Sequence, residues 1–202
     1  MQEVSLKQLK EMAEIARSYI WERAKGLGRN PKIYLHWTAG SYDTKFSDYH
    51  INITGDGRIW VSTDYLGDTL NHTWRRNTGS IGVALCCAKD AGSTSLGSYP
   101  PTEAQIETMA QVIAVLADAL WLTINKAHVM THGEAANNED GLCVHDPYAW
   151  WNDSYGDGDT RGDLEYLGTP ESPLYNPWAT DGTRGGDVLR GKAIWYKNQG
   201  VK

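Results

Sequence analysis

Residues 81–88, IGVALCCA, form a nearly continuous apolar run with turn-forming residues around it. A strand reads this way when both of its faces are buried, because neither set of alternating side chains then meets water. Such a strand usually lies in the middle of a sheet that has helices packed on its faces. The run therefore predicts an α/β fold in which this segment is a central strand.

Two amphipathic stretches are long enough to be helices that cover such a sheet. Over residues 5–25 the apolar side chains recur every three or four residues, and Ser5 with Gln8 makes a capping box at the start. The second helix follows Pro100-Pro101 and begins with the capping box of Thr102 and Gln105. A shorter helical tail is expected over residues 186–198.

Short β-type runs supply the rest of the sheet. In residues 32–38 Ile33, Leu35 and Trp37 share one face, while Tyr34, His36 and Thr38 share the other. Residues 49–54 and 58–62 flank a Gly-Asp-Gly turn and predict a hairpin, and a further strand is expected around residues 127–131. These elements predict one domain over residues 1–202, with a central mixed sheet flanked by helices and a core at about residues 30–170.

Charge and hydropathy argue against two classes of partner. The 202 residues carry a formal net charge of −6 and no stripe of Lys and Arg, whereas nucleic-acid binding requires a basic surface. No apolar run approaches the roughly 18–20 residues of a membrane span, so no membrane anchor is expected. The polar start MQEVSLKQLKEM does not resemble a signal peptide, which places the chain in the cytoplasm of the producing cell.

The three cysteines, Cys86, Cys87 and Cys143, do not form a disulfide framework. Neighbouring residues in a strand point to opposite faces, so Cys86 and Cys87 are poorly placed to bridge each other. We expect all three to be buried free thiols.

Two histidines lie where predicted strands end. His36 is on the polar side of its strand just before Ala39-Gly40, and His132 follows the run AHVM. A catalytic zinc site needs three protein ligands and an open fourth position, and these histidines would supply two. Spacing alone leaves the third ligand open among several residues: Asp140, Cys143, His145, Asp157, Asp159 and Asp163. A structural role for both histidines is the alternative.

Read together, five segments carry a family resemblance. They are IYLHWTAG (33–40), DYHINITGDGRIW (48–60), NHTWRRNTGSIGVAL (71–85), VMTHGEAA (129–136) and DTRGDLEYL (159–167). In this order they resemble the zinc-dependent N-acetylmuramoyl-L-alanine amidases, a family that also includes many phage lysins and the peptidoglycan recognition proteins.

The resemblance implies a role for individual residues. His36, His132 and Asp163 match the ligands of a catalytic Zn²⁺, and Tyr49 matches a tyrosine beside the metal. Arg161 matches a Lys or Arg position and would stabilise an oxyanion. The substrate groove would be bordered by three further residues: Trp37, for which core packing is the alternative, His72 and Asn77.

The general base is open at this stage. Some relatives have a glutamate where this chain has Ala84. Glu134, two residues after His132, and Tyr49 are the candidates for acid/base catalysis. A carboxylate at position 134 could equally orient a histidine ligand. Gly162 is a second departure, because similar phage sequences often have tryptophan there.

The segment at residues 136–160 is predicted to be an aromatic loop that touches glycan or stem peptide. The alternative is a second metal site formed by Cys143, His145 and Asp146.

The resemblance implies hydrolysis of the amide between N-acetylmuramic acid and L-alanine, with peptidoglycan as partner and the chain acting as a monomer. A phage or prophage lysin that reaches the cell wall by holin-type export fits the absence of a signal peptide. The alternatives are a non-catalytic peptidoglycan-binding module, a cytoplasmic muropeptide-recycling amidase and a toxin delivered to rival cells.

Overall fold

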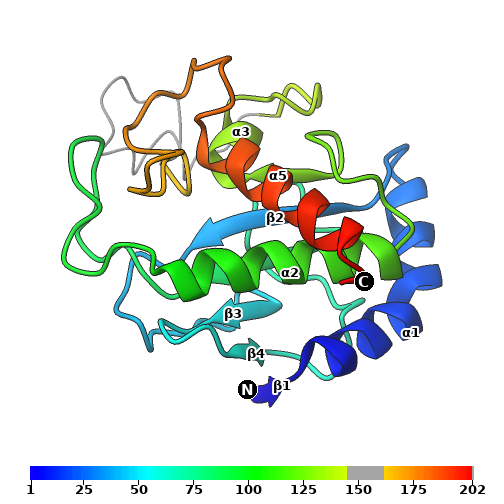
Figure 1. The fold of residues 1–202 in the computed structure, drawn as a ribbon. Coiled ribbons are helices and arrows are strands. Elements are labelled where there is room, and N and C mark those ends of the chain that lie inside the picture. The colour runs from blue at the N-terminus through cyan, green and yellow to red at the C-terminus, as the bar shows by residue number, and fades with distance from the viewer. Residues whose placement is uncertain (145–161, 202) are drawn as a thin grey trace.

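The computed structural model describes residues 1–144 and 162–201. The chain has an α/β fold, built on a central mixed sheet of six strands in the order β1-β4-β3-β5-β2-β6 (Figure 1). The strands are β1 (Gln2–Val4), β2 (Lys32–Trp37), β3 (Ile51–Ile53), β4 (Ile59–Val61), β5 (Ser80–Leu85) and β6 (Val129–Thr131). The apolar run proposed as a central strand is β5, which pairs in parallel with β2 and β3.

The remaining pairs complete a sheet that is parallel on one side and antiparallel on the other. β2 also pairs in parallel with β6, so that β2 lies between two parallel neighbours. β4 pairs antiparallel with both β3 and β1. The β3–β4 hairpin agrees with the turn predicted from Gly55-Asp56-Gly57.

The described helices are α1 (Leu6–Lys25), α2 (Glu103–Ala119), α3 (His132–Ala136) and α5 (Gly185–Asn198). Both predicted capping boxes are present, with Ser5 accepting from the amide of Gln8 and Thr102 accepting from the amide of Gln105. α1 and α2 pack on each other, and α5 lies along α2 and β6 (Figure 1). Among the described residues, no helix combines the length and apolar character that crossing a membrane requires.

The two faces of β2 have different surroundings, as its alternating pattern predicted. Ile33, Leu35 and Trp37 belong to the main hydrophobic core, together with apolar residues of α1, α2 and the neighbouring strands. Tyr34 belongs to a second small cluster with Met130 and Ala135. The sheet therefore presents His36 to a different environment from the one that holds the core.

Three features differ from the sequence predictions. β1 was not predicted, because its short polar segment becomes a strand only by pairing with Ile59–Val61. The helix that starts at His132 was also missed, since its one turn is too short to show a period. Cys143 is exposed, so the prediction of a buried thiol was wrong there and right for Cys86 and Cys87.

Candidate metal centre

Neighbouring parallel strands bring the two predicted histidine ligands together. His36 is fully buried near the carboxyl end of β2, and His132 follows β6 directly as the first residue of α3. Because β2 and β6 are parallel, their carboxyl ends lie at the same edge of the sheet. The side chain of Thr131 caps α3 by accepting from the amide of Glu134, which fixes the backbone at His132.

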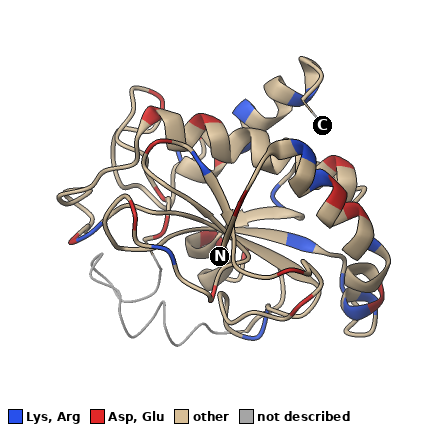
Figure 2. Cartoon of the chain, turned by 90° about the horizontal axis from the view of Figure 1, so that it is seen from below, with Lys and Arg blue, Asp and Glu red and all other residues tan. Residues whose placement is uncertain are grey.

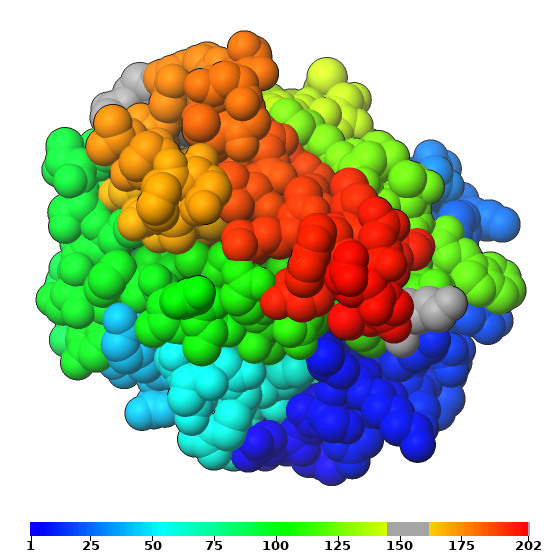
Figure 3. Space-filling model, viewed as in Figure 1, coloured from blue at the N-terminus to red at the C-terminus, as the bar shows by residue number. Residues whose placement is uncertain are grey.

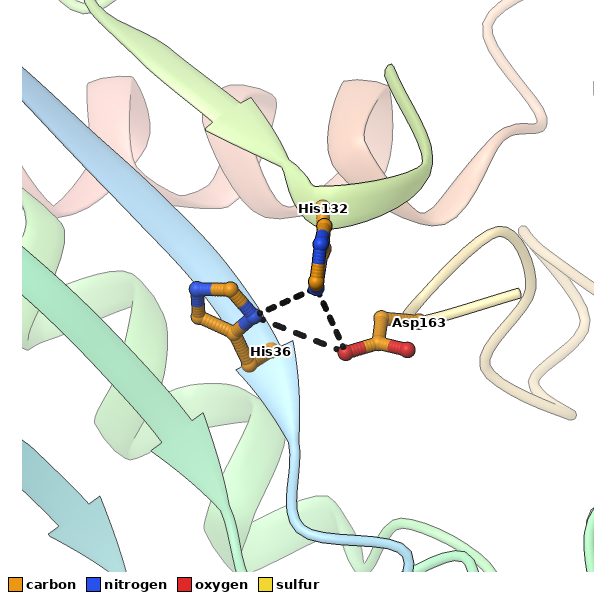
Figure 4. A group of neighbouring side chains, drawn as sticks. All are labelled: His36, His132 and Asp163. Carbon is orange, nitrogen blue, oxygen red and sulfur yellow. Dashed lines mark hydrogen bonds and ion pairs between the residues drawn. The ribbon is translucent and has the colours of Figure 1, made fainter. Parts of the chain in front are cut away.

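Asp163 reaches the same place from a loop far along the chain, and its side chain is fully buried. Its Oδ2 atom lies 3.5 Å from Nδ1 of His36 and 3.5 Å from Nδ1 of His132. The two Nδ1 atoms are 3.2 Å apart. All three side chains point toward one another (Figure 4), and their donor atoms are close enough together that the group could hold a metal ion.

The donor set fits zinc. Zn²⁺ binds imidazole nitrogen and carboxylate oxygen at about 2.0–2.2 Å, so two ligands of a tetrahedral site are about 3.3 to 3.6 Å apart. The two separations of 3.5 Å fall within that range, and the separation of 3.2 Å lies just below it. Three protein donors also leave the fourth position that a catalytic site requires.

A chain of hydrogen bonds behind His36 fixes its ring. Nε2 of His36 lies 3.3 Å from Oγ1 of Thr73, and that hydroxyl lies 3.0 Å from Nδ1 of His72. Nε2 of His72 is 3.4 Å from Oγ of Ser80, which donates to the backbone carbonyl of Arg76. A consistent polarity along this chain has a proton on each Nε2, so that the lone pair of His36 Nδ1 faces His132 and Asp163.

Two further histidines beside this chain are kept neutral. Burial lowers the pKa of His72 well below its ordinary value, and the neighbouring His36 lowers it further. Burial also lowers the pKa of His50 to about 4, against an opposing hydrogen bond to the carbonyl of Asp68. Nδ1 of His50 accepts from the amide of Gly82, so this ring ties β5 to the loop at Asp68. His50 is therefore a buried structural residue.

Tyr49 lies beside the metal centre. Its ring is 4.9 Å from the ring of His36 between centroids, and its hydroxyl donates to the backbone carbonyl of Trp37 at 3.4 Å. The side chain is half-buried, so the hydroxyl is held near the cluster without being sealed off. Trp37 itself packs in the main core, the alternative given for it from the sequence.

His72 and Asn77 support the loop that carries Thr73. Oδ1 of Asn77 accepts from the backbone amides of both His72 and Thr73, at 3.1 and 2.7 Å. His72 is 5% exposed, and its ring lies against those of His36 and Tyr34. These contacts favour a supporting role, and their predicted contact with substrate stays a prediction.

The carboxylate of Glu134 is held by hydrogen bonds from its neighbours. Its Oε2 atom accepts from the amide of Thr131 at 2.9 Å, and both carboxylate oxygens accept from Arg190 at 2.8 Å. Burial opposes ionisation, but Arg190 lowers the pKa of Glu134 below its ordinary value. A carboxylate held in this way favours the orienting alternative, and its predicted part in acid/base catalysis stays untested.

Ala84 lies directly opposite His36 on the neighbouring strand β5. Paired residues of adjacent strands project from the same face, so a glutamate at this position would lie beside His36. This chain has a methyl group there, which leaves Tyr49 as the acid/base candidate beside the described cluster.

Several predicted residues fall outside the described part of the chain. Arg161 is one of them, and the others are His145, Asp146, Asp157 and Asp159, together with most of the segment at 136–160. The alternative third ligand Asp140 is described, and its carboxylate pairs with Arg76 at 2.7 Å. Cys143 is described and exposed.

The sequence profile of the N-acetylmuramoyl-L-alanine amidase family matches residues 26–146, more than half of the chain. The chain belongs to this amidase family. The match includes His36, Tyr49, His72 and His132, and it ends before Asp163. Family membership supports N-acetylmuramoyl-L-alanine amidase activity, whereas the third donor of the cluster comes from a part of the chain that the profile does not reach.

Solved structures of lytic and recognition proteins are also similar to this amidase-family chain. The endolysin of Thermus scotoductus MAT2119 bacteriophage Ph2119 is 18% identical, with 50% of this chain and 70% of that chain covered and a TM-score of 0.39. The endolysin amidase LysCS of Clostridium intestinale URNW is 15% identical, with 56% and 71% covered and a TM-score of 0.41. Drosophila PGRP-LB is 16% identical, with 52% and 69% covered and a TM-score of 0.38. No curated protein matches the sequence.

Sequence reasoning missed three polar residues around the cluster. Thr73 lies inside the segment NHTWRRNTG, and no pattern in the sequence marks its hydroxyl as a partner of His36. Arg184 and Arg190 lie beyond every segment that carried the resemblance, and they pair with buried glutamates near the ligands. Arg190 lies in the helical tail predicted at residues 186–198, whereas Arg184 lies just before it.

Proposed function

We propose that this chain is a zinc-dependent amidase that hydrolyses the bond between N-acetylmuramic acid and L-alanine in peptidoglycan. The observation that carries the proposal is the convergence of Nδ1 of His36, Nδ1 of His132 and Oδ2 of Asp163 at zinc-ligand spacing. Membership of the amidase family supports the choice of this amide as the bond that is hydrolysed.

When bound, zinc would polarise the amide carbonyl and make hydroxide available near neutral pH. The residues of the chain provide the rest of the catalysis. Thr73 keeps His36 in the tautomer whose Nδ1 faces the cluster, and Asp163 supplies a negative charge that balances the cation. Burial of all three donors fixes their geometry before substrate arrives.

Amide hydrolysis also requires a proton to reach the leaving amine. Tyr49 is our candidate for holding that proton, because its ring stacks at an angle beside His36 and its hydroxyl lies at the carbonyl of Trp37. Arg161 is proposed as the cation that stabilises the developing oxyanion, since it is two residues before Asp163.

We further propose that the chain acts as a monomer on the wall of a bacterial cell, as a phage or prophage lysin released from the producing cytoplasm. Two lytic enzymes among the similar structures are named as endolysins, which supports this setting without extending their targets to this chain.

The test is mass spectrometry of the products released from purified peptidoglycan by zinc-loaded and by chelated protein. Stem peptides with a free L-alanine amino terminus should appear with the loaded protein alone. Intact peptidoglycan in both samples, with zinc bound to the protein, would instead indicate a wall-binding module. Activity on soluble muropeptides and none on sacculi would indicate a recycling enzyme.

A further inference from the structure

The carboxyl-terminal helix touches both ligand-bearing segments through buried arginine–glutamate pairs. Arg190, on α5, donates to Oε1 and Oε2 of Glu134 at 2.8 Å each. Arg184, the N-cap residue of α5, donates to Oε1 and Oε2 of Glu165 at 2.8 and 2.9 Å. All four side chains are at least nine-tenths buried.

The two pairs have the same relation to the cluster. Glu134 is two residues after His132, and Glu165 is two residues after Asp163. Each guanidinium forms two parallel hydrogen bonds with its carboxylate, an arrangement that fixes orientation as well as distance. One helix therefore sets the backbone position of two ligands that come from separate parts of the chain.

Additional contacts tie each arginine to the surrounding backbone and side chains. Arg190 also donates to the carbonyl of Val129 in β6 at 2.9 Å, and Arg184 donates to Glu139 at 2.9 Å. Figure 3 shows the red residues of α5 lying between the green residues of α2 and the yellow-green residues that lead to α3. The helix thus packs along α2, while Arg184 and Arg190 near its start contact the segments that carry His132 and Asp163.

Two glycines allow this close approach. A Cβ atom at Gly185 would lie 1.9 Å from the carbonyl oxygen of Leu164, beside Asp163. A Cβ atom at Gly186 would lie 2.9 Å from Oε1 of Glu134. The amide of Gly185 also donates to the carbonyl of Glu165 at 3.0 Å. The first turn of α5 therefore packs closely on both ligand-bearing segments, against the backbone of Leu164 at Gly185 and against the side chain of Glu134 at Gly186.

We propose that Arg184 and Arg190 are positioning residues of the zinc site, so that the functional metal centre includes a helix outside the segment matched by the family profile. The inference rests on the proposed function, because it takes zinc as the occupant. It predicts that zinc affinity depends on α5 even though no residue of α5 is a ligand.

Charge-conserving substitutions test the idea, because lysine keeps the charge and loses the two-pronged hydrogen bonding. R184K and R190K should each weaken zinc binding by about 10- to 100-fold, the usual effect of losing a partner behind a ligand. K192M is the matched control, because Lys192 lies on the same helix and pairs with Glu107 of α2 at 2.6 Å. Zinc affinity of K192M should stay within about twofold of wild type.

Zinc dissociation constants would be measured by competition with a chromophoric chelator, with far-UV circular dichroism of each metal-free variant as the folding check. The absorption bands of cobalt-loaded protein give a second readout, which a purely structural role would leave unchanged. R184K and R190K should shift these bands and K192M should not. Wild-type zinc affinity and cobalt spectrum in folded R184K and R190K would overturn the inference.

Double variants keep the test valid if the single lysine variants fail to fold. E134M/R190M and E165M/R184M replace each pair by apolar side chains, a change that often leaves stability intact. Their zinc affinity should still fall about 10-fold or more, and unchanged affinity would overturn the inference. A wild-type protein that binds no zinc would instead contradict the proposed function, whatever the variants do.

Discussion

The two halves of the proposed metal centre are held in place by different means. His36 and His132 sit at the ends of β2 and β6, so that main-chain hydrogen bonds between parallel strands set their positions. Asp163 sits in a loop next to Leu164, whose φ of 59° is rare for a branched side chain. Its position depends on tertiary contacts with the start of α5, through Gly185 and the Arg184–Glu165 pair.

The family profile covers one of these two halves and not the other. The histidine half lies within residues 26–146, and the Asp163 half lies beyond them with α5. A ligand on a strand end needs little besides the sheet to be positioned, whereas a ligand on a loop needs partners that hold the loop. Figure 2 shows acidic and basic residues mixed along the outer helices. The Arg184–Glu165 and Arg190–Glu134 pairs, in contrast, are buried.

The largest expected effect is loss of any ligand from either half. H36A, H132A and D163A should each lower kcat/KM on peptidoglycan by about a thousandfold, or about 4 kcal/mol, as zinc is lost. Metal content and hydrolysis of the wall would be measured for each variant. D118N is the control, because Asp118 pairs with Lys10 on the outer helices. Full zinc occupancy and activity in D163A would make the third ligand another residue, with positions 145–161 the next to examine.

Acid should lower the free energy of unfolding of the metal-free protein, because His50 is buried in its neutral form. The folded-state pKa of His50 is about 4 and its unfolded value is about 6.5, so the unfolded chain binds the extra proton between these pH values. Stability is therefore present above pH 6.5 and falls as pH drops toward 4, by about 3 kcal/mol from this residue.

Urea unfolding of metal-free wild type and H50Q from pH 7 to pH 4 measures this contribution. H50Q is expected to be less stable at pH 7, and the gap should narrow by about 3 kcal/mol at pH 4. A gap that stays constant across this range would show that His50 does not carry the acid sensitivity.

Two glycines of α5 test the Asp163 half. G185A places a methyl group against the carbonyl of Leu164, and should lower the free energy of unfolding by about 2 kcal/mol, with weaker zinc binding. G191A has open space around its Cβ position, and should raise the free energy of unfolding by about 0.5–1 kcal/mol. Urea denaturation compares them, and equal effects of the two substitutions would contradict the close packing at Gly185.

A smaller expected effect, on zinc binding alone, concerns the hydrogen bond behind His36. T73V removes the hydroxyl that bridges His36 and His72, and should weaken zinc binding about 10-fold with the fold preserved. T108V is the control, because Thr108, on α2, donates to the carbonyl of Gly57 instead. Unchanged zinc affinity in T73V, measured by chelator competition, would show that strand pairing alone orients His36.

Local sequence patterns predicted the elements that carry the two histidines. The alternation in residues 32–38 placed His36 opposite the core-facing side chains, and the capping boxes at Ser5 and Thr102 marked where α1 and α2 begin. These features depend on side chains a few residues apart. The choice of Asp163 over the other five candidates depended on the family resemblance, because spacing did not distinguish them.

The support of the Asp163 half could not be read from local patterns. Arg184 pairs with Glu165, 19 positions away, and Arg190 pairs with Glu134, 56 positions away. Contacts over such separations leave no periodic pattern in the sequence. β1 was missed for the same reason, because its strand conformation comes from pairing with β4. Tertiary contacts between distant segments decide these features.

The most direct test of the central claim is an anomalous difference map of the crystallised protein, recorded on both sides of the zinc absorption edge. The account predicts one strong peak about 2.0–2.2 Å from Nδ1 of His36, Nδ1 of His132 and a carboxylate oxygen of Asp163. A peak bound by the two histidines and a different third residue would contradict the claim that loop and strands build one site. A zinc-saturated crystal with no peak there would contradict the metal centre altogether.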